Sequence, residues 1–114
     1  MVTPTLTQEI TQLHADICSA LADPKRILIL YALAEQPRNV SEVAGEVGIS
    51  QPAASRHLNI LRERGMVSAK REGQAVVYML VDARTIQALD LLRAVLADNL
   101  RTRGLLAETF LDPH

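Results

Sequence analysis

The stretch from Val40 to Arg71 decides the fold and reads VSEVAGEVGISQPAASRHLNILRERGMVSAKR. Apolar residues recur at helical spacing before Gly48 and again after Ser50. Glycine commonly ends a helix, and serine is a favoured N-cap for the helix that follows. Pro52 fits the first turn of that second helix. The stretch therefore predicts two short helices joined by a tight turn, which is a helix-turn-helix.

The second helix is the one that such a motif lays in the major groove of DNA. At ~100° per residue, Ala54, Leu58 and Leu61 share one side and are expected to pack inward. The outer side and first turn carry Gln51, Pro52, Ser55, Arg56, Asn59 and Glu63. Glutamine and asparagine match adenine, whereas arginine matches guanine or a phosphate. Gln51, Ser55, Arg56 and Asn59 are therefore the base-reading candidates; the alternative is an ordinary solvated helix face.

A β-hairpin is expected directly after the second helix, which Gly65 closes. Met66–Lys70 and Val76–Val81 read as strands, and Arg71–Ala75 reads as the glycine-bearing loop between them. A helix-turn-helix followed by a hairpin is a winged helix. Three side chains near the wing tip are expected to reach phosphates or the minor groove, and they are Lys70, Arg71 and Gln74.

Positive charge is concentrated in this part of the chain. Between Gln51 and Arg71, Glu63 is the single acidic residue, against Arg56, Arg62, Arg64, Lys70 and Arg71. The whole chain has a formal net charge of −1, so the positive charge is local. A local basic face on a slightly acidic protein is typical of a DNA surface, and Arg62 is expected to contact a phosphate. A winged helix used only for protein–protein contacts would need no such face.

The segments before the helix-turn-helix are expected to be helical. A first helix is predicted over Leu6–Ala22, with an apolar stripe of Leu6, Ile10, Leu13, Ile17 and Leu21. Asp23 is the expected N-cap of a second helix that runs to about Ala34. Its buried residues are expected to be Ile27, Leu28, Leu30, Tyr31 and Leu33. Gln36–Asn39 reads as a loop.

A long last helix is predicted from a cap at Asp82 to Arg103, where Gly104 interrupts it. Leu105–Phe110 is expected to add a final turn, and residues 112–114 are expected to fray. One apolar stripe contains Ile86, Leu89, Leu92, Leu96 and Leu100, and a second, roughly opposite, contains Ala88, Leu91 and Val95. A surface helix needs one stripe, so the first is expected to pack on the subunit's own core and the second predicts a dimer interface, which the first helix would share. The alternative is that one subunit buries both stripes.

Five segments resemble the ArsR/SmtB family of bacterial winged-helix repressors, and they are Leu21–Leu30, Ser50–Arg62, Gly65–Val67, Arg71–Gln74 and Val77–Tyr78. They occur in the family's order and spacing, and the resemblance extends over most of the chain. It implies a homodimer that binds an operator and releases it when an effector arrives. Two-fold symmetry would make that operator an inverted repeat. The alternative is a member of the family that has no inducer of its own.

The residues of the family's usual metal sites are missing. Members that bind metal often use a Cys-x-Cys pair in the first helix of the helix-turn-helix, but residues 39–44 contain no cysteine. Others use ligands along the last helix, but residues 82–103 contain no histidine. His14 and Cys18 are four residues apart and would suit a metal or thiol sensor shared with a partner, although packing at the edge of the apolar stripe is the simpler interpretation. His57 is expected to pack or to touch a phosphate rather than to read a base.

The whole chain of 114 residues is expected to form one domain, mainly α with a β-hairpin wing and about five helices. Its parts are a helix-turn-helix at 40–64, a wing at 66–81 and a dimerisation helix at 82–103. No apolar run approaches the ~18 residues of a membrane span, and no positively charged leader opens the sequence, so we expect a cytoplasmic protein. A single cysteine excludes an internal disulfide. No phosphate loop, nucleophile elbow or paired carboxylate site appears, so neither catalysis nor a cofactor is predicted.

Overall fold

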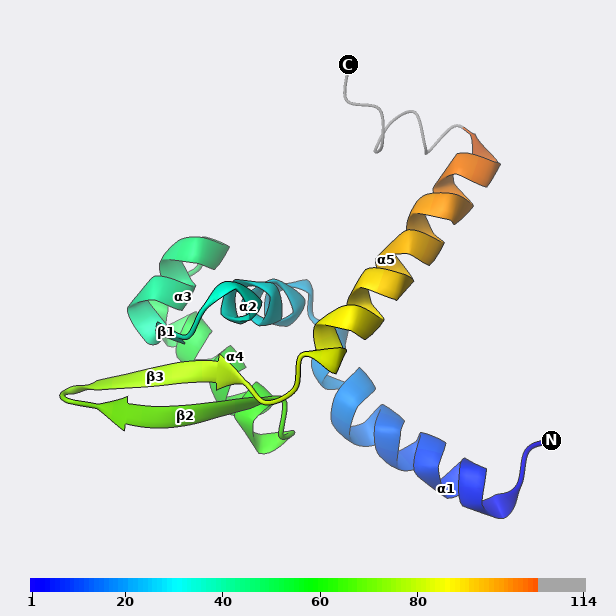
Figure 1. Ribbon diagram of the computed structural model, residues 1–114, viewed down its shortest axis with the longest axis horizontal. Helices are drawn as coiled ribbons and strands as arrows, with labels where there is room; N and C mark the ends of the chain where they lie inside the picture. The colour runs from blue at the N-terminus through cyan, green and yellow to red at the C-terminus, as the bar shows by residue number, and fades with distance from the viewer. Residues whose placement is uncertain (105–114) are drawn as a thin grey trace. The chain divides into compact units, whose positions relative to one another are not determined.

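The computed structural model describes residues 1–104, and the chain divides into two compact units after Asp82. The first unit contains α1 (Pro4–Leu13), a π-helical turn η1 (His14–Cys18), a 3-10 turn η2 (Ala20–Ala22), α2 (Pro24–Glu35), β1 (Arg38–Asn39), α3 (Val40–Val47), α4 (Gln51–Glu63), β2 (Val67–Glu72) and β3 (Ala75–Leu80) (Figure 1). The second unit contains α5 (Arg84–Arg103). This is the predicted winged helix with five α-helices. The turn predicted at Leu105–Phe110 and the end predicted to fray lie outside the described residues.

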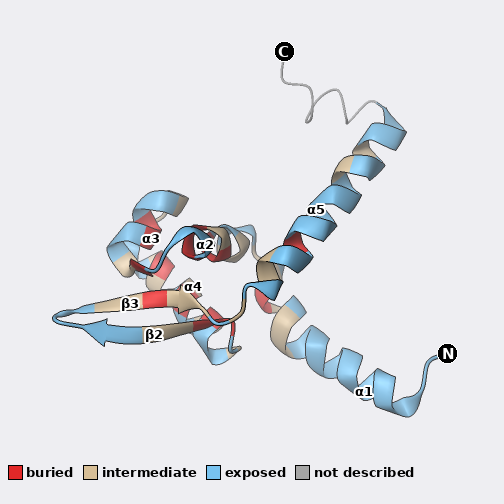
Figure 2. Ribbon diagram, viewed as in Figure 1, coloured by how far each residue is buried: buried red, intermediate tan, exposed pale blue. Residues whose placement is uncertain are grey.

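The core of the first unit lies between α2, α3, α4 and the sheet (Figure 2). The inward face predicted for the second helix of the motif is confirmed, because Ala54, Leu58 and Leu61 are all fully buried. The other buried apolar residues of the unit are Ala20, Ile29, Leu30, Ala32, Leu33, Val43, Ala44, Met66, Val67 and Tyr78. Since these side chains come from all three helices and the hairpin, α4 cannot shift without disrupting the core. We call α4 the recognition helix, because a helix-turn-helix lays its second helix in the major groove.

The burial predicted for α2 is partly wrong. Leu30 and Leu33 are buried and Ile27 and Tyr31 are half-buried, but Leu28 is 48% exposed. Ile29, which the sequence reading left out, is fully buried instead. An almost uninterrupted apolar run has no polar side to mark its inward face, so only the packing against α3 and α4 identifies it.

The turn between α3 and α4 has the predicted caps. Gly48 adopts a φ of 75°, a left-handed conformation that glycine takes without a steric penalty. The Ser50 hydroxyl accepts the amide hydrogen of Ala53. At the far end of α4, Gly65 also has a φ of 75°, and Met66 donates its amide to Leu61 as in a Schellman motif. Both ends of the recognition helix are therefore fixed by local chemistry.

The sheet is larger than predicted, with three antiparallel strands in the order β1-β3-β2. The prediction of a loop at Gln36–Asn39 is partly wrong: Gln36 and Pro37 form the loop, but Arg38 pairs with Tyr78 and Asn39 with Val77. The hairpin loop is also shorter than expected: Glu72 pairs with Ala75, which leaves Gly73 and Gln74 as the turn. Gly73 has the positive φ that a two-residue hairpin turn favours.

The first helix is not continuous, so the prediction of one helix over Leu6–Ala22 is wrong. Only Pro4–Leu13 is α-helical, and η1 and η2 follow it. Part of the predicted stripe is not buried either, because Leu6, Ile10 and Leu13 are exposed. Such irregular turns arise from packing and hydrogen bonds with other segments, which the apolar spacing does not record.

The second unit is the single long helix α5. Its N-cap is Ala83, which makes no side-chain cap, so the prediction of Asp82 as the cap is wrong. The end at Gly104 is as predicted, with a φ of 81°. Leu89 is buried and Ile86 and Leu100 are half-buried, but the assignment of Leu92 and Leu96 to the subunit's own core is wrong, because both are exposed. The second stripe, Ala88, Leu91 and Val95, is exposed as well, so the alternative in which one subunit buries both stripes is also wrong.

No helix within residues 1–104 combines the length and apolar character needed to cross a membrane.

We expect Leu30→Ala and Leu28→Ala, two identical changes on one helix, to differ sharply in stability. Leu30 is fully buried, so its truncation leaves a cavity and should lower the free energy of unfolding by roughly 2–5 kcal/mol. Leu28 is largely exposed, so its truncation should change that free energy by about 0.5 kcal/mol or less. Urea denaturation of both variants measures the difference, and equal losses would contradict the burial described for α2.

Candidate nucleic-acid interface

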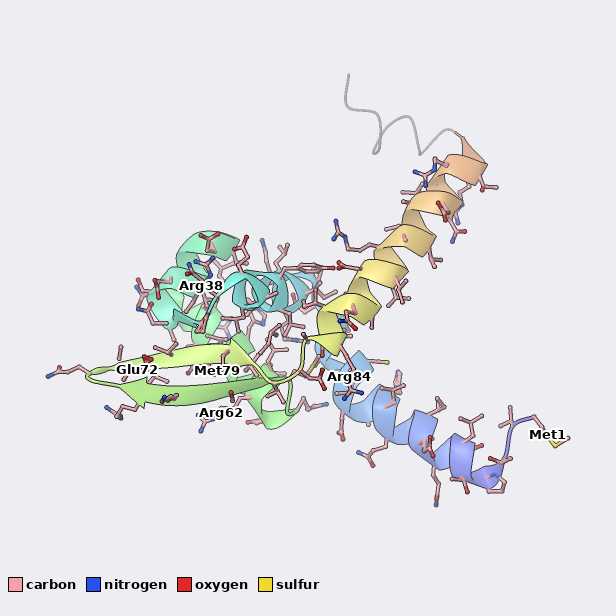
Figure 3. All side chains as sticks on the ribbon, in the orientation of Figure 1. Met1, Arg38, Arg62, Glu72, Met79 and Arg84 are labelled. Carbon is pink, nitrogen blue, oxygen red and sulfur yellow. The ribbon has the colours of Figure 1, made fainter. Side chains whose placement is uncertain are left out.

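The outer face of α4 presents most of the predicted base-reading residues to solvent. Gln51, Arg56 and Asn59 are exposed, and so is the predicted phosphate contact Arg62 (Figure 3). Ser55 is half-buried, so its hydroxyl is less accessible than the others. The opposite face of the helix is buried, which leaves this polar side as the one free to enter a groove. The contacts of these side chains with DNA remain predictions.

Ser41, in the first turn of α3, joins this surface and was missed by the sequence reading. The side-chain amide of Gln51 donates to the Ser41 hydroxyl over 3.4 Å, and both residues are exposed. In a helix-turn-helix the first helix crosses the DNA backbone while the second reads the bases. The position of Ser41 at the start of that first helix was the signal that could have found it.

Arg64 does not belong to the basic face. It is half-buried, and its guanidinium donates to the Ala15 carbonyl and, over 2.7 Å, to the Ser19 hydroxyl. Counting it among the charges free to meet DNA was therefore wrong. Four cations remain exposed, Arg56 and Arg62 on α4 and Lys70 and Arg71 on the wing.

The two wing cations point to opposite faces of the hairpin, because successive side chains of a strand alternate. Arg71 shares the face of Val67, which is buried against the helices, and its cross-strand partner is Val76. Lys70 lies on the other face with Glu72, which sits near the wing tip (Figure 3). Arg71 is therefore on the side of the wing that packs on the helices, and Glu72 partly offsets the charge of Lys70. Gln74 lies in the exposed turn.

His57 packs against α2 rather than projecting outward. It is half-buried, and its Nδ1 lies 3.4 Å from the Arg26 guanidinium. This contact agrees with the packing interpretation, and the histidine is not among the residues of the outer face.

His14 and Cys18 both lie in η1 and both are exposed, so the interpretation that they pack into an apolar stripe is wrong. Among residues 1–104, no group of three or more His, Cys, Asp or Glu side chains is close enough to hold a metal ion. A sensor formed by these two residues together with a partner chain was the alternative, and nothing in this structure tests it.

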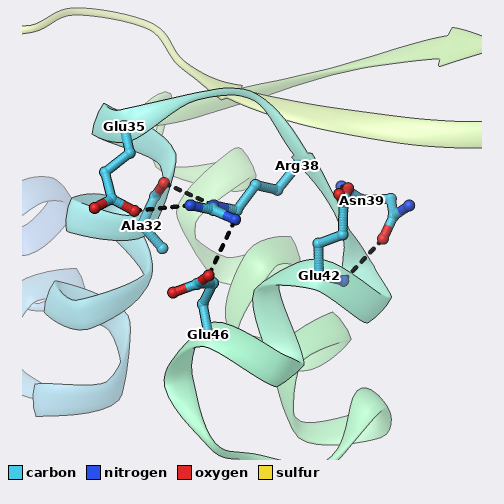
Figure 4. A network of polar contacts seen from close by, with 6 residues as sticks. All are labelled: Ala32, Glu35, Arg38, Asn39, Glu42 and Glu46. Carbon is cyan, nitrogen blue, oxygen red and sulfur yellow. Dashed lines mark hydrogen bonds and ion pairs between the residues drawn. The ribbon is translucent and has the colours of Figure 1, made fainter.

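A buried arginine fixes the helix that carries Ser41. Arg38 is only 7% exposed, and its guanidinium donates to the Ala32 carbonyl over 3.0 Å (Figure 4). It also forms ion pairs with Glu35 at 2.7 Å and Glu46 at 3.3 Å. The adjacent Asn39 caps α3 in a reciprocal capping box with Glu42. Arg38 and Asn39, which form the third strand β1, therefore join the end of α2 and helix α3 to strand β3.

The fold and the site define a winged helix whose recognition helix and wing carry an exposed basic face. The family model for bacterial regulatory proteins of the arsR family matches residues 23–69. The chain is 34% identical to the nodulation protein NolR of Rhizobium meliloti, over 84% of this chain and 79% of that protein. It is 37% identical to a probable mercury resistance operon repressor of Streptomyces lividans, over 82% of this chain and 78% of that protein.

A solved structure is similar as well. The homodimeric winged helix-turn-helix domain of Mb0332 from Mycobacterium bovis, described as a possible ArsR-family regulator, matches with a TM-score of 0.74. The two are 28% identical, and the match covers 89% of this chain and 93% of that one. The chain therefore belongs to the arsR family of bacterial regulatory proteins, and it is a DNA-binding transcriptional repressor.

We expect Arg56→Ala to weaken binding to a preferred duplex by roughly 1–3 kcal/mol, because an arginine that reads a base loses a bidentate contact. The loss should be smaller on unrelated DNA. Arg62→Ala, on the same helix, is the matched comparison and should weaken binding to all sequences alike. Competition binding assays with both kinds of duplex measure the two effects, and an unchanged affinity of a folded Arg56→Ala protein would remove Arg56 from the interface.

For the wing we expect the loss of a phosphate contact rather than of a base contact. Arg71→Ala should lower the affinity for every sequence and reduce the salt slope of binding by about one unit, since one phosphate contact is lost. Lys70→Ala makes a similar change of charge on the other face of the hairpin and should reduce the slope less. Titrations at several salt concentrations measure the slopes. A changed sequence preference with an unchanged slope would show instead that Arg71 reads bases.

Proposed function

We propose that the protein acts as a homodimer that represses transcription by binding an inverted-repeat operator and is released by an effector. One copy of α4 would enter each half-site, and the wing would hold the flanking phosphates. In this proposal the repressor works in the cytoplasm, where a bacterial chromosome lies.

The observation that carries the dimer is the exposed apolar surface of α5. Leu91 is 70% exposed, and Leu92, Val95 and Leu96 are also more than half exposed. Large contiguous apolar surfaces on a small protein mark interaction sites, because their hydration is unfavourable. Helix α1 adds exposed Leu6, Ile10 and Leu13, and we propose that it shares the interface. The homodimeric description of the similar Mb0332 domain supports the same assembly.

Two-fold symmetry gives the operator its form. Recognition helices related by a two-fold axis reach two half-sites in opposite orientation, about 34 Å or one turn of B-DNA apart. Each subunit supplies only half of the contacts, so the affinity for the whole operator depends on the dimer. Release by an effector is supported by the similarity of this chain to a probable mercury resistance operon repressor.

We expect Leu91→Glu to produce a monomer that binds its operator poorly. The substitution places an unpaired carboxylate in an apolar contact, which is costly. Ala94→Glu is the matched control, since it adds the same carboxylate at an exposed position of α5 outside both stripes. Sedimentation velocity and operator titration of both variants provide the measurement. If Leu91→Glu remains a dimer with normal affinity, this stripe is not the interface.

A further inference from the structure

Two arginines of the DNA-binding unit converge on the break that follows α1. From α4, the Arg64 guanidinium donates to the Ala15 carbonyl and the Ser19 hydroxyl. From α2, Arg26 donates through Nε to the Ala20 carbonyl over 2.6 Å and through Nη2 to the Ser19 carbonyl over 3.3 Å. All of these acceptors belong to the short segment between Ala15 and Ala20. We call this set of contacts the arginine clasp.

The π-helical turn makes the acceptors available. In an α-helix the Ser19 amide would donate to the Ala15 carbonyl, but here it donates to His14 over 3.0 Å. The Ala15 carbonyl instead accepts from the Ser19 hydroxyl and from Arg64. Hydrogen bonds from a charged donor to such carbonyls are stronger than neutral ones. The irregular turn and the two arginines therefore form one unit.

The clasp ties the segment that follows α1 to the recognition helix, in addition to the packing of the buried Ala20. Helix α1 has no buried residue, and its apolar face is exposed, so its own side chains do not hold it in a core. Arg64 is the C-cap residue of α4, so a contact that holds Arg64 also holds the C-terminal end of the recognition helix. His57, about two turns earlier on α4, contacts Arg26 of the same clasp.

We propose that Arg64 is a positioning residue that fixes the direction of α1 relative to the recognition helix and so sets the half-site spacing that the dimer prefers. The inference rests on the proposed homodimer, in which α1 shares the interface. With α1 held by the partner and clasped to α4, the distance between two recognition helices is fixed. Without the clasp, α1 and α4 move relative to each other, and several spacings are accepted equally.

The experiment compares duplexes that the wild-type protein selects from a randomised library. The selected inverted repeat is rebuilt with its half-sites moved together or apart by whole base pairs, and an isolated half-site serves as reference. Arg64→Ala should lower the preference for the optimal spacing about tenfold, the size expected for one charged hydrogen bond. Its affinity for the isolated half-site and its salt slope should not change, because Arg64 is not placed on the DNA surface.

Two further variants separate the clasp from its alternatives. Ser19→Ala removes one acceptor that belongs to neither α4 nor the wing, and it should flatten the spacing preference in the same direction. Combined with Arg64→Ala it should add little, because both changes break the same contact. Arg62→Ala, an exposed arginine on the same helix, should lower the affinity at every spacing and leave the optimum in place. Thermal melting confirms that each variant is folded.

The outcomes distinguish the role of the clasp from the proposed two-fold dimer on which it rests. A wild-type protein without any spacing optimum would overturn both the two-fold dimer and the clasp. An optimum that folded Arg64→Ala and Ser19→Ala proteins retain in full would overturn the clasp alone. A salt slope reduced by about one unit in Arg64→Ala, with the optimum unchanged, would show that Arg64 contacts a phosphate instead.

Discussion

The removal of Arg38 from water is the constraint on which the DNA-binding unit depends. A buried guanidinium is strongly unfavourable unless its donors are satisfied, and losing one partner of such a charge typically costs about 3–5 kcal/mol. The partners come from the Ala32 carbonyl of α2, from Glu35 at its end and from Glu46 on α3. Both carboxylates remain largely exposed, which limits their own desolvation. Satisfying this one charge requires α2, α3 and the third strand to meet in a single arrangement.

The recognition helix uses one face to stabilise the core and the other to present polar side chains to solvent. Its inner residues are as deeply buried as any in the protein, while its outer side is polar and exposed. Because the caps at Ser50 and Gly65 fix both ends, few side chains of the outer face are needed for stability. That face is therefore free to carry residues chosen for DNA, and substitutions there change recognition more than folding.

Local patterns in the sequence predicted the helix-turn-helix, its caps and the wing, since apolar spacing and glycine or serine positions act over a few residues. They failed where distant segments decide the structure. The strand at Arg38 exists because β3 offers it a partner, and the break after Leu13 coincides with carbonyls that accept from Arg26 and Arg64. The outward residues of α4 were predicted, but the hydrogen bonds of Arg64 with Ala15 and Ser19 were not. In the sequence, an arginine beside a basic helix face looks the same whether its guanidinium binds DNA or its own chain.

The π-helical turn at His14–Cys18 is equivalent to one residue more than a regular helix needs. The wide turn absorbs most of the rotation of about 100° that one added residue would give an α-helix, so α1 keeps nearly the direction of a regular helix. Deleting one residue there would therefore leave the direction of α1 almost unchanged, but it would return to ordinary helical bonds a carbonyl that now accepts from Arg64. A one-codon deletion at this turn is thus a route by which a lineage of such regulators loses the contact between α1 and the DNA-binding helices in one mutational step, while the helix-turn-helix keeps its sequence.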